Sequence, residues 1–226
     1  MPDNAKVDEL LSGETVALAA NQDGILISAT QVQTAGVLDD RFSAAAEGLE
    51  YGALLTDSGV TFRVWAPTAQ QAELVIYSAD KKVIGSHPMT RDNESGAWSY
   101  QGSHDLKDAF YRYALTVYHP QSRKVEQYEV TDPYSHSLST NSEYSQVVDL
   151  NDSALKPEGW DGLAMPHPQT SQADIAKMVI HESHVRDLSA WDQTVPEQVR
   201  GKYLALTASD SNMVQHLRKL GQAGVT

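Results

Sequence analysis

Two closely spaced histidines are the side chains in this sequence that most suggest metal chemistry. They flank a glutamate in the stretch His181-Glu-Ser-His184. The zinc motif His-Glu-x-x-His needs two residues between the glutamate and the second histidine, so that both histidines lie on one face of a helix. Here only Ser183 intervenes, and in a strand the two histidines would point to opposite faces. We therefore expect no metal site here and interpret both histidines as packing or hydrogen-bonding residues.

Acidic side chains gather at two turns, where their oxygen atoms could bind calcium. One turn holds Asp39 and Asp40, and the other holds Asp149, Asn151 and Asp152. The sequence contains no twelve-residue EF-hand loop, so solvated acidic turns are the favoured interpretation and calcium binding is the alternative. Glycine-rich phosphate loops of the GxGxxG or Walker type are absent from the sequence.

The composition excludes several classes of partner. The 226 residues include 17 Lys and Arg against 30 Asp and Glu, which gives a net charge of −13. Because no Lys/Arg-rich stretch is present, nucleic acids and anionic membranes are poor partners. The sequence has no cysteine, which excludes disulfides and thiolate metal sites. No apolar run reaches the roughly 18 residues of a membrane span, and the N-terminus shows no signal-peptide pattern.

A series of short strands is predicted between residues 49 and 150. In Gly59–Trp65 the apolar residues Val60, Phe62 and Val64 alternate with bulkier or polar ones, which is the period of a half-buried strand. Further β-rich runs are found at 72–77, 96–100, 110–118, 125–130 and 145–150. Short strands with turn residues about every ten positions are typical of an all-β sandwich.

Two segments with a different character flank this domain. Residues 1–48 are predicted to contain a hairpin of strands 14–20 and 24–29, joined by the turn signal Asn21-Gln-Asp-Gly24. Two strands alone are marginally stable, so this segment is expected to dock on something or to be the tail of a preceding β domain. Residues 151–174 are rich in Pro, Gly and Asp and are predicted to form a linker.

Residues 175–226 are predicted to hold one strand, a long loop and one helix. The apolar run Ala176–His181 resembles a buried strand, and the stretch Ser211–Leu220 has apolar residues at helical spacing. Ser209 or Asp210 is expected to cap the start of this helix.

Five stretches, taken together and in this order, resemble one family. Gly59–Thr68 resembles the opening strand of family 48 carbohydrate-binding modules, and Asp132-Pro-Tyr-Ser135 resembles the motif that closes them. Gln33–Asp40 resembles the segment that leads into such a module. Ile180–Ser189 and Met213–Thr226 resemble the first strand and the first helix of a catalytic barrel. The sequence is thus similar to the N-terminal part of pullulanase-type starch-debranching enzymes of glycoside hydrolase family 13.

The resemblance implies a mainly β fold in two parts. An immunoglobulin-like β-sandwich of the family 48 type would cover residues 49–150, and the first βα unit of an incomplete TIM barrel would cover 175–226. A barrel strand normally lies between two neighbours, so a lone one would leave Met178–Ile180 as an unpaired apolar edge. We therefore expect residues 176–226 to be disordered, docked irregularly on the sandwich, or paired with another copy of the chain.

The resemblance also implies a function. The parent enzyme would cleave α-1,6 branch links in pullulan and amylopectin, outside a bacterial cell or at its surface. Glycoside hydrolysis needs two carboxyl groups, and in this family both lie on later barrel strands. We therefore assign no catalytic residue here, expect the chain to be inactive by itself, and expect an α-glucan as its partner, weakly bound if at all. No cofactor is expected, although calcium is compatible with the full-length parent.

Aromatic rings with neighbouring cations are the candidates for sugar binding, because sugar rings have apolar faces and hydroxyl edges. In glycogen-binding relatives a tryptophan and a basic residue on neighbouring strands contact glucan. By position Arg112 resembles the basic residue and Tyr128 falls near the tryptophan, whereas the turn Ser78–Lys82 lacks a second tryptophan of the family. Trp98 is a further candidate, with core packing as the favoured alternative. The wider set of candidates comprises Tyr111, Tyr113, Tyr118, Lys124 and Tyr134.

The remaining aromatic residues are interpreted as packing residues. Trp65 and Tyr113 lie on alternating strands and are expected in or near the core, while Trp160 and Trp191 are expected to anchor loops. Two other functions stay open beside glucan binding. The sandwich could be a purely structural brace for the barrel, or an immunoglobulin-like module that binds a protein.

Overall fold

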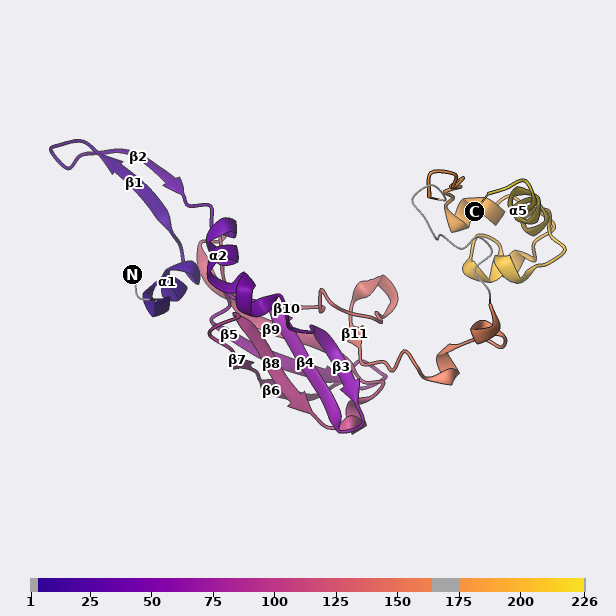
Figure 1. Ribbon diagram of the computed structural model, residues 1–226, viewed down its shortest axis with the longest axis horizontal. Helices are drawn as coiled ribbons and strands as arrows, with labels where there is room; N and C mark the ends of the chain where they lie inside the picture. The colour runs from indigo at the N-terminus through magenta and orange to yellow at the C-terminus, as the bar shows by residue number, and fades with distance from the viewer. Residues whose placement is uncertain (1–3, 164–174, 226) are drawn as a thin grey trace. The chain divides into compact units, whose positions relative to one another are not determined.

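The computed structural model describes residues 4–163 and 175–225, which fall into two compact units, Met1–Leu155 and Lys156–Thr226 (Figure 1). The first unit begins with a helix, a hairpin and a second helix and continues into a β-sandwich. The bounds of the first four elements are α1 (Asn4–Leu11), β1 (Val16–Ala20), β2 (Leu26–Gln31) and α2 (Ala35–Ala46).

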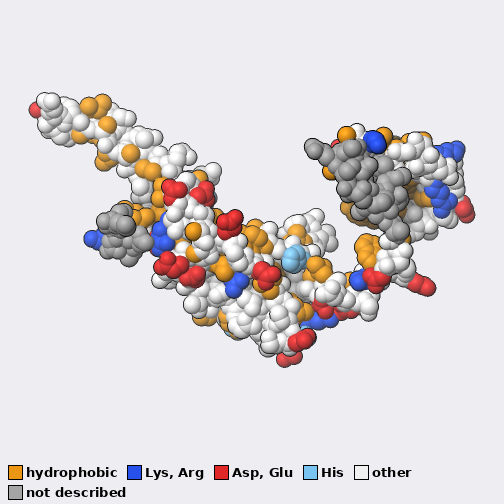
Figure 2. All heavy atoms as spheres, viewed as in Figure 1, with side chains coloured by type: hydrophobic (Ala, Val, Ile, Leu, Met, Phe, Trp, Pro, Cys, Tyr) orange, Lys and Arg blue, Asp and Glu red, His pale blue; other side chains and the backbone are white. Residues whose placement is uncertain are grey.

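The predicted N-terminal hairpin is confirmed. Strands β1 and β2 pair antiparallel, and the side chain of Asn21 closes the turn by accepting hydrogen bonds from the backbone N–H groups of Asp23 and Ile25, at 3.0 and 2.8 Å. Every residue of both strands is exposed, and apolar side chains follow the hairpin in Figure 2. The apolar residues Leu18 and Ile27 are therefore mostly exposed in the described part of the chain, at 67% and 69%.

The sandwich consists of two antiparallel sheets, which confirms the all-β prediction. The first sheet has the order β3-β4-β8-β7, and the second has the order β10-β9-β5-β6, with β11 paired to β9. Their bounds are β3 (Gly52–Thr56), β4 (Gly59–Trp65), β5 (Gln71–Tyr77), β6 (Val83–Pro88), β7 (Thr90–Arg91), β8 (Ala97–Gly102), β9 (Phe110–His119), β10 (Lys124–Val130) and β11 (Ser145–Gln146). Short 3₁₀ turns lie at His104–Leu106 and Thr140–Ser142.

The core lies between the two sheets and follows the alternation seen in the sequence. Val60, Phe62 and Val64 of β4 are each 3% exposed or less, whereas the residues between them are half-buried. From the facing sheet, Tyr111 meets Phe62 edge-on with the ring centres 5.0 Å apart. Alternate residues of both sheets thus interdigitate, which is how sandwiches of this kind exclude water. The buried residues of this core are Val60, Phe62, Val64, Ala69, Ala72, Leu74, Ile76, Met89, Trp98, Tyr111, Tyr113 and Val147.

A buried carboxylate joins β9 to the segment that follows β10. Asp132 is 4% exposed, and its Oδ2 accepts hydrogen bonds from the hydroxyls of Tyr111 (2.7 Å) and Tyr113 (3.1 Å). Its Oδ1 accepts from the backbone N–H of Tyr134 at 2.8 Å. Burial raises the pKa of Asp132, and these hydrogen bonds only partly offset that effect. The stretch Asp132–Ser135 thus closes the sandwich by satisfying buried tyrosine hydroxyls.

Helix α2 is held against the sandwich by one buried ring and is joined to α1 by one ion pair. Phe42 is 1% exposed, and the guanidinium of Arg41 lies 4.6 Å from the centre of its ring. Arg41 also pairs with Asp8 of α1 at 3.0 Å. Beyond the helix, the hydroxyl of Tyr51 donates to the backbone oxygen of Ala46 at 3.0 Å. The guanidinium of Arg91 in β7 lies 5.7 Å from the ring of Phe42, so the buried face of α2 meets the sandwich beside β7.

The second unit differs from its prediction. Residues 178–184 form neither helix nor strand, so the strand predicted at 176–181 is wrong for this structure. A barrel strand depends on two neighbours, and the described residues of this unit supply no partner strand. Short helices instead surround a small core of Val195, Ala205 and Met213. The helices of this unit are η4 (Trp160–Gly162), α4 (Val185–Ser189), η5 (Glu197–Val199), η6 (Tyr203–Thr207) and α5 (Asn212–Gln222), while η3 (Ser153–Leu155) ends the first unit.

The predicted helix near the C-terminus is confirmed as α5, with a different cap. The hydroxyl of Ser211, rather than Ser209 or Asp210, accepts from the backbone N–H of Val214 at 3.2 Å. The carboxylate of Asp192 accepts a second N–H of the first turn, that of Met213, at 2.8 Å. Residues 164–174 of the predicted linker lie outside the described residues.

Candidate functional site

The two main candidates for sugar binding lie on opposite faces of the second sheet. Residues that pair directly across antiparallel strands point to the same face. Tyr128 pairs with Leu115, which contacts the core, whereas Arg112 shares the opposite, outer face with Ala114. On β10 it is Glu129, the residue after Tyr128, that lies on the same face as Arg112. The structure therefore does not bring Arg112 and Tyr128 together.

Arg112 is held by the strand beside it. Its Nη2 donates to the backbone oxygen of Glu129 at 2.7 Å, and its Nη1 lies 3.4 Å from the carboxylate of the same residue. The hydroxyl of Tyr77 donates to that carboxylate at 2.6 Å. Burial, reinforced by this hydrogen bond to a negative group, raises the pKa of Tyr77 to about 12. Because the Nη1 contact is long, the guanidinium keeps N–H groups that Glu129 does not use.

Aromatic rings surround this arginine on the outer face. Tyr144 lies 5.6 Å from the guanidinium carbon of Arg112 and meets Tyr77 edge-on, with ring centres 4.9 Å apart. The ammonium of Lys81 lies 3.0 Å from the ring centre of Phe110. Lys81 belongs to the turn that lacks the second tryptophan of the family. At this turn the structure has instead a lysine ammonium that contacts a phenyl ring. We call the following residues the outer-face cluster: Tyr77, Lys81, Phe110, Arg112, Glu129 and Tyr144.

Sequence reasoning identified Arg112 but missed the aromatic members of the outer-face cluster. Phe110 is the first residue of β9 and Tyr77 is the last residue of β5. Their pairing across the two strands depends on the register of the sheet. Tyr144 lies in an irregular segment, for which no period indicates a face. A strand alternation count starting from Arg112 could have indicated Phe110 and Ala114 as its neighbours on one face.

The other two candidates occupy different settings. Tyr128 is 38% exposed on the edge strand β10, and its hydroxyl donates to Glu126 at 2.7 Å. Its ring lies 5.4 Å from that of His119. Trp98 is only 7% exposed, and its indole N–H donates to the backbone oxygen of Ala66 at 3.0 Å. Its burial supports the core alternative, because a ring inside the core offers no face to a ligand.

The histidines of the 181–184 stretch serve local structure. The ring of His184 accepts from the backbone N–H of Arg186 at 3.2 Å and caps α4, while His181 hydrogen-bonds Ser183 at 2.7 Å. Within the described residues, His, Asp and Glu side chains form no group of three or more that could hold a metal ion. Among those same residues, no helix has the length and apolar character needed to cross a membrane. Trp160 and Trp191 are 54% and 88% exposed, so they do not anchor loops as expected.

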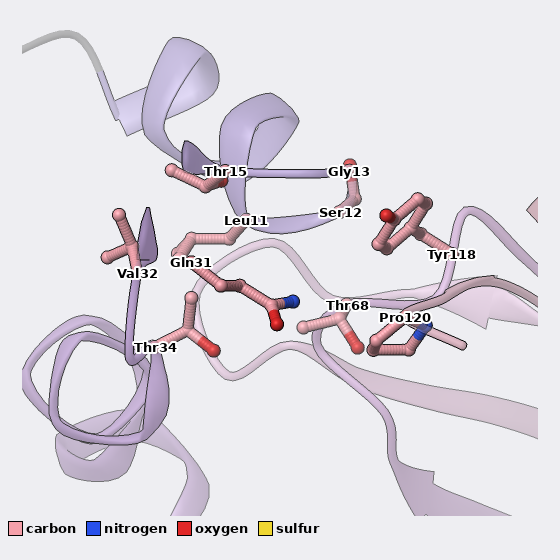
Figure 3. A pocket seen from close by; sticks show the side chains of 10 residues that line it. All are labelled: Leu11, Ser12, Gly13, Thr15, Gln31, Val32, Thr34, Thr68, Tyr118 and Pro120. Carbon is pink, nitrogen blue, oxygen red and sulfur yellow. The ribbon is translucent and has the colours of Figure 1, made fainter. Parts of the chain in front are cut away.

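A small neutral pocket lies where the N-terminal helix and the base of the hairpin meet the sandwich (Figure 3). Its volume is about 180 Å³, below the roughly 300 Å³ at which ligand pockets usually begin. Figure 3 shows the amide of Gln31 extending toward Thr68. The lining residues are Leu11, Ser12, Gly13, Thr15, Gln31, Val32, Thr34, Thr68, Tyr118 and Pro120. The size of this pocket makes it a weaker candidate than the outer-face cluster.

The fold and the outer-face cluster define a class of protein. A two-sheet antiparallel sandwich that presents aromatic rings and cations on an open face has the form of a binding module, and its chemistry suits sugar rings. These features are those of a β-sandwich binding module.

Comparison with known proteins gives the particular family. Residues 48–135 match the family model of carbohydrate-binding module 48, the isoamylase N-terminal domain, and residues 1–40 match that of the pullulanase N2 domain. The whole chain is 80% identical to a pullulanase of Klebsiella pneumoniae and 39% identical to pullulanase 1, chloroplastic, of Arabidopsis thaliana. Over its whole length the chain thus matches the N-terminal region of pullulanases, with a carbohydrate-binding module 48 at residues 48–135.

The solved structures agree with this assignment. A crystal structure of Klebsiella pneumoniae pullulanase complexed with maltotriose matches 100% of this chain with a TM-score of 0.91 and 81% identity. The chain covers 21% of that structure, and it spans 21% and 23% of the lengths of the Klebsiella and Arabidopsis relatives. It thus corresponds to about a fifth of a pullulanase.

Proposed function

We propose that this chain is the glucan-binding N-terminal part of a pullulanase-type enzyme that debranches α-1,6-glucans, without catalytic activity of its own. The observation that carries the proposal is the match of residues 48–135 to carbohydrate-binding module 48, because that stretch includes both sheets of the sandwich up to β10. The maltotriose bound by the related Klebsiella pullulanase supports an α-glucan as the ligand class.

We place the glucan on the outer-face cluster. The rings of Tyr144 and Phe110 are half-buried, so each retains accessible surface for the apolar face of a sugar. Arg112 is 28% exposed along its side chain and can donate the N–H groups that Glu129 leaves unused to sugar hydroxyls. Tyr128, on the opposite face and at the sheet edge, would be a separate contact for a long glucan chain.

The second unit has a supporting role in this proposal. Residues 175–226 would be the opening part of the catalytic barrel, and the stretch 176–181 would form a strand only when neighbouring barrel strands pair with it. The similarity of Ile180–Ser189 to a first barrel strand supports this assignment. The protein would act outside a bacterial cell or at its surface, as the pullulanase resemblance implies.

A structural brace is the second candidate function. The favouring observation is that Arg112 and Glu129 satisfy each other, which leaves the guanidinium less available than a free one. The two functions differ in whether the isolated chain binds glucan.

Arg112→Ala is expected to weaken glucan binding about ten- to hundredfold, because a lost hydrogen bond from a charged group costs on the order of 1.5–3 kcal/mol. The measurement is the mobility of the purified chain in native gels that contain pullulan, amylopectin or no polysaccharide. Arg123→Ala is the matched control, since this arginine is 70% exposed and lies outside the outer-face cluster. If the unmodified chain migrates equally in all three gels, glucan binding is excluded, and the structural brace is favoured over it.

A further inference from the structure

A groove runs between helix α2 and the first sheet, away from every residue of the outer-face cluster. Its volume is about 390 Å³, within the range of small-ligand pockets. One wall comes from α2, and the other comes from aromatic residues at the start of β3, the end of β4 and the Asp132–Ser135 motif. The lining residues are Asp39, Ser43, Ala46, Glu47, Tyr51, Trp65 and Tyr134.

The aromatic wall of this groove is a rigid platform. The rings of Tyr51 and Tyr134 stack with their centres 4.8 Å apart and their planes 21° from parallel. Gly52 makes this stack possible: a Cβ there would come within 2.9 Å of the backbone oxygen of Tyr134, and its φ of +97° favours glycine. The indole N–H of Trp65 is held by the backbone oxygen of Ser95 at 2.8 Å. Rings that are already fixed lose little entropy when a ligand binds.

The opposite wall offers unused polar groups. Asp39, Ser43 and Glu47 are spaced four residues apart, which places them along one face of α2. All three are exposed, and their side chains make no hydrogen bond to any residue that the structure describes. The hydroxyl of Tyr134, 37% exposed as a residue, also has no hydrogen-bond partner among those residues. Carboxylates and hydroxyls of this kind accept hydrogen bonds from ligand O–H groups.

The charge and shape of the groove select one class of ligand. Two carboxylates without a lysine or arginine in the lining disfavour anions. An organic cation would suit the carboxylates, but cation sites enclose the charge with rings, and here the two tyrosines lie nearly parallel in one stack. A neutral ring with an apolar face and many hydroxyl donors matches both walls.

We propose that the α2 groove is a second saccharide-binding site, which takes a glucosyl unit of an α-glucan. The sugar ring packs on Tyr134, and its hydroxyls donate to Asp39 and Glu47. Only the choice of α-glucan over another saccharide rests on the proposed function. The two sites share no residue, so a long glucan could be held at two places on one module, which raises its apparent affinity without any new contact.

The test is a titration of the full chain with maltotriose, followed by the backbone amide signals in two-dimensional NMR. Signals of Ser43, Glu47 and Tyr51 are expected to shift. Tyr134→Ala is expected to weaken the response of these signals about five- to tenfold, since one aromatic contact contributes on the order of 0.5–1.5 kcal/mol. Tyr203→Ala is the matched control, because this tyrosine is 77% exposed in the second unit.

A milder pair of variants guards against a folding defect in Tyr134→Ala. Glu47→Gln removes one charge from an exposed side chain and is expected to weaken maltotriose binding about threefold to tenfold. Glu158→Gln makes the same change at an exposed residue of the second unit and should leave binding unchanged. Equal binding by Glu47→Gln, Tyr134→Ala and the unmodified chain would overturn the proposal.

The outcomes for the two sites are distinguishable. If Arg112→Ala abolishes all maltotriose-induced shifts while the α2-groove variants change none, the second site is excluded and the proposed function stands. If the groove signals shift in the unmodified chain and in Arg112→Ala alike, the second site is supported even where the outer-face cluster fails. Shifts of the groove signals with choline chloride and none with maltotriose would make the ligand an organic cation and overturn the saccharide proposal.

Discussion

Trp98→Ala is expected to lower the free energy of unfolding of the sandwich by about 3–5 kcal/mol, the usual cost of removing a large aromatic side chain from a core. The indole is 7% exposed and belongs to the main core, so its removal leaves a cavity between the sheets. The substitution also removes the hydrogen bond from the indole to the backbone oxygen of Ala66, which keeps only the one from the N–H of Ala69.

Urea titration followed by the amide NMR signals of β4 and β9 measures this loss within the first unit. Unit-specific signals are needed because two units need not unfold in one transition. Trp191→Ala is the control, since this tryptophan is 88% exposed and should change stability by at most about 0.5 kcal/mol. Unchanged stability of Trp98→Ala with lost glucan binding would show instead that the indole contacts the ligand.

Asp132→Ala is expected to destabilise the sandwich by about 2–3 kcal/mol, because the buried hydroxyls of Tyr111 and Tyr113 lose their acceptor. The loss is moderated because the buried carboxylate is costly to ionise, as its raised pKa indicates. Asp132→Asn keeps the shape and part of the hydrogen bonding, so it is expected to cost less than alanine.

The pH dependence of stability provides a second test of the role of Asp132. Its pKa is higher in the folded chain than the ordinary value of 3.8, so the folded state binds the proton more tightly. The resulting stabilisation is complete below pH 3.8 and is lost as the pH rises through the folded pKa. The stability of Asp132→Asn, measured by urea titration between pH 3 and 7, should lack this component. If stability depends on pH in the same way for Asp132→Asn and for the unmodified chain, Asp132 does not titrate in this way.

The sequence predicted what depends on local pattern. The alternation in Gly59–Trp65 indicated the inner and outer faces of β4, and the spacing of apolar residues indicated α5. The strand predicted at 176–181 failed because a strand needs partners, and apolar character alone does not supply them.

The candidate site was harder to predict because it depends on register. Arg112 and Tyr128 were paired by position along the chain, yet a shift of one residue in a strand moves a side chain to the other face of the sheet. The stack of Tyr51 on Tyr134 joins residues 83 positions apart (134 − 51), and no sequence period connects them. Such contacts form only when the two sheets are packed, so they cannot be predicted before the fold is known.

Strand β9 pairs with three others, and this has a kinetic consequence. Its partner β10 follows after a four-residue turn (120–123), whereas 32 residues (78–109) lie between β5 and β9. Pairing β5 with β9 therefore requires the closure of a much longer loop. The β9–β10 hairpin should therefore form early and act as the template on which β5 is added. Substitutions in this hairpin would slow refolding, and those in the outer strand β6 would mainly speed unfolding. Stopped-flow refolding of Ala114→Gly and of His87→Ala, which removes the β6 ring stacked on Tyr100, would distinguish the two, and equal effects on both rates would contradict this order.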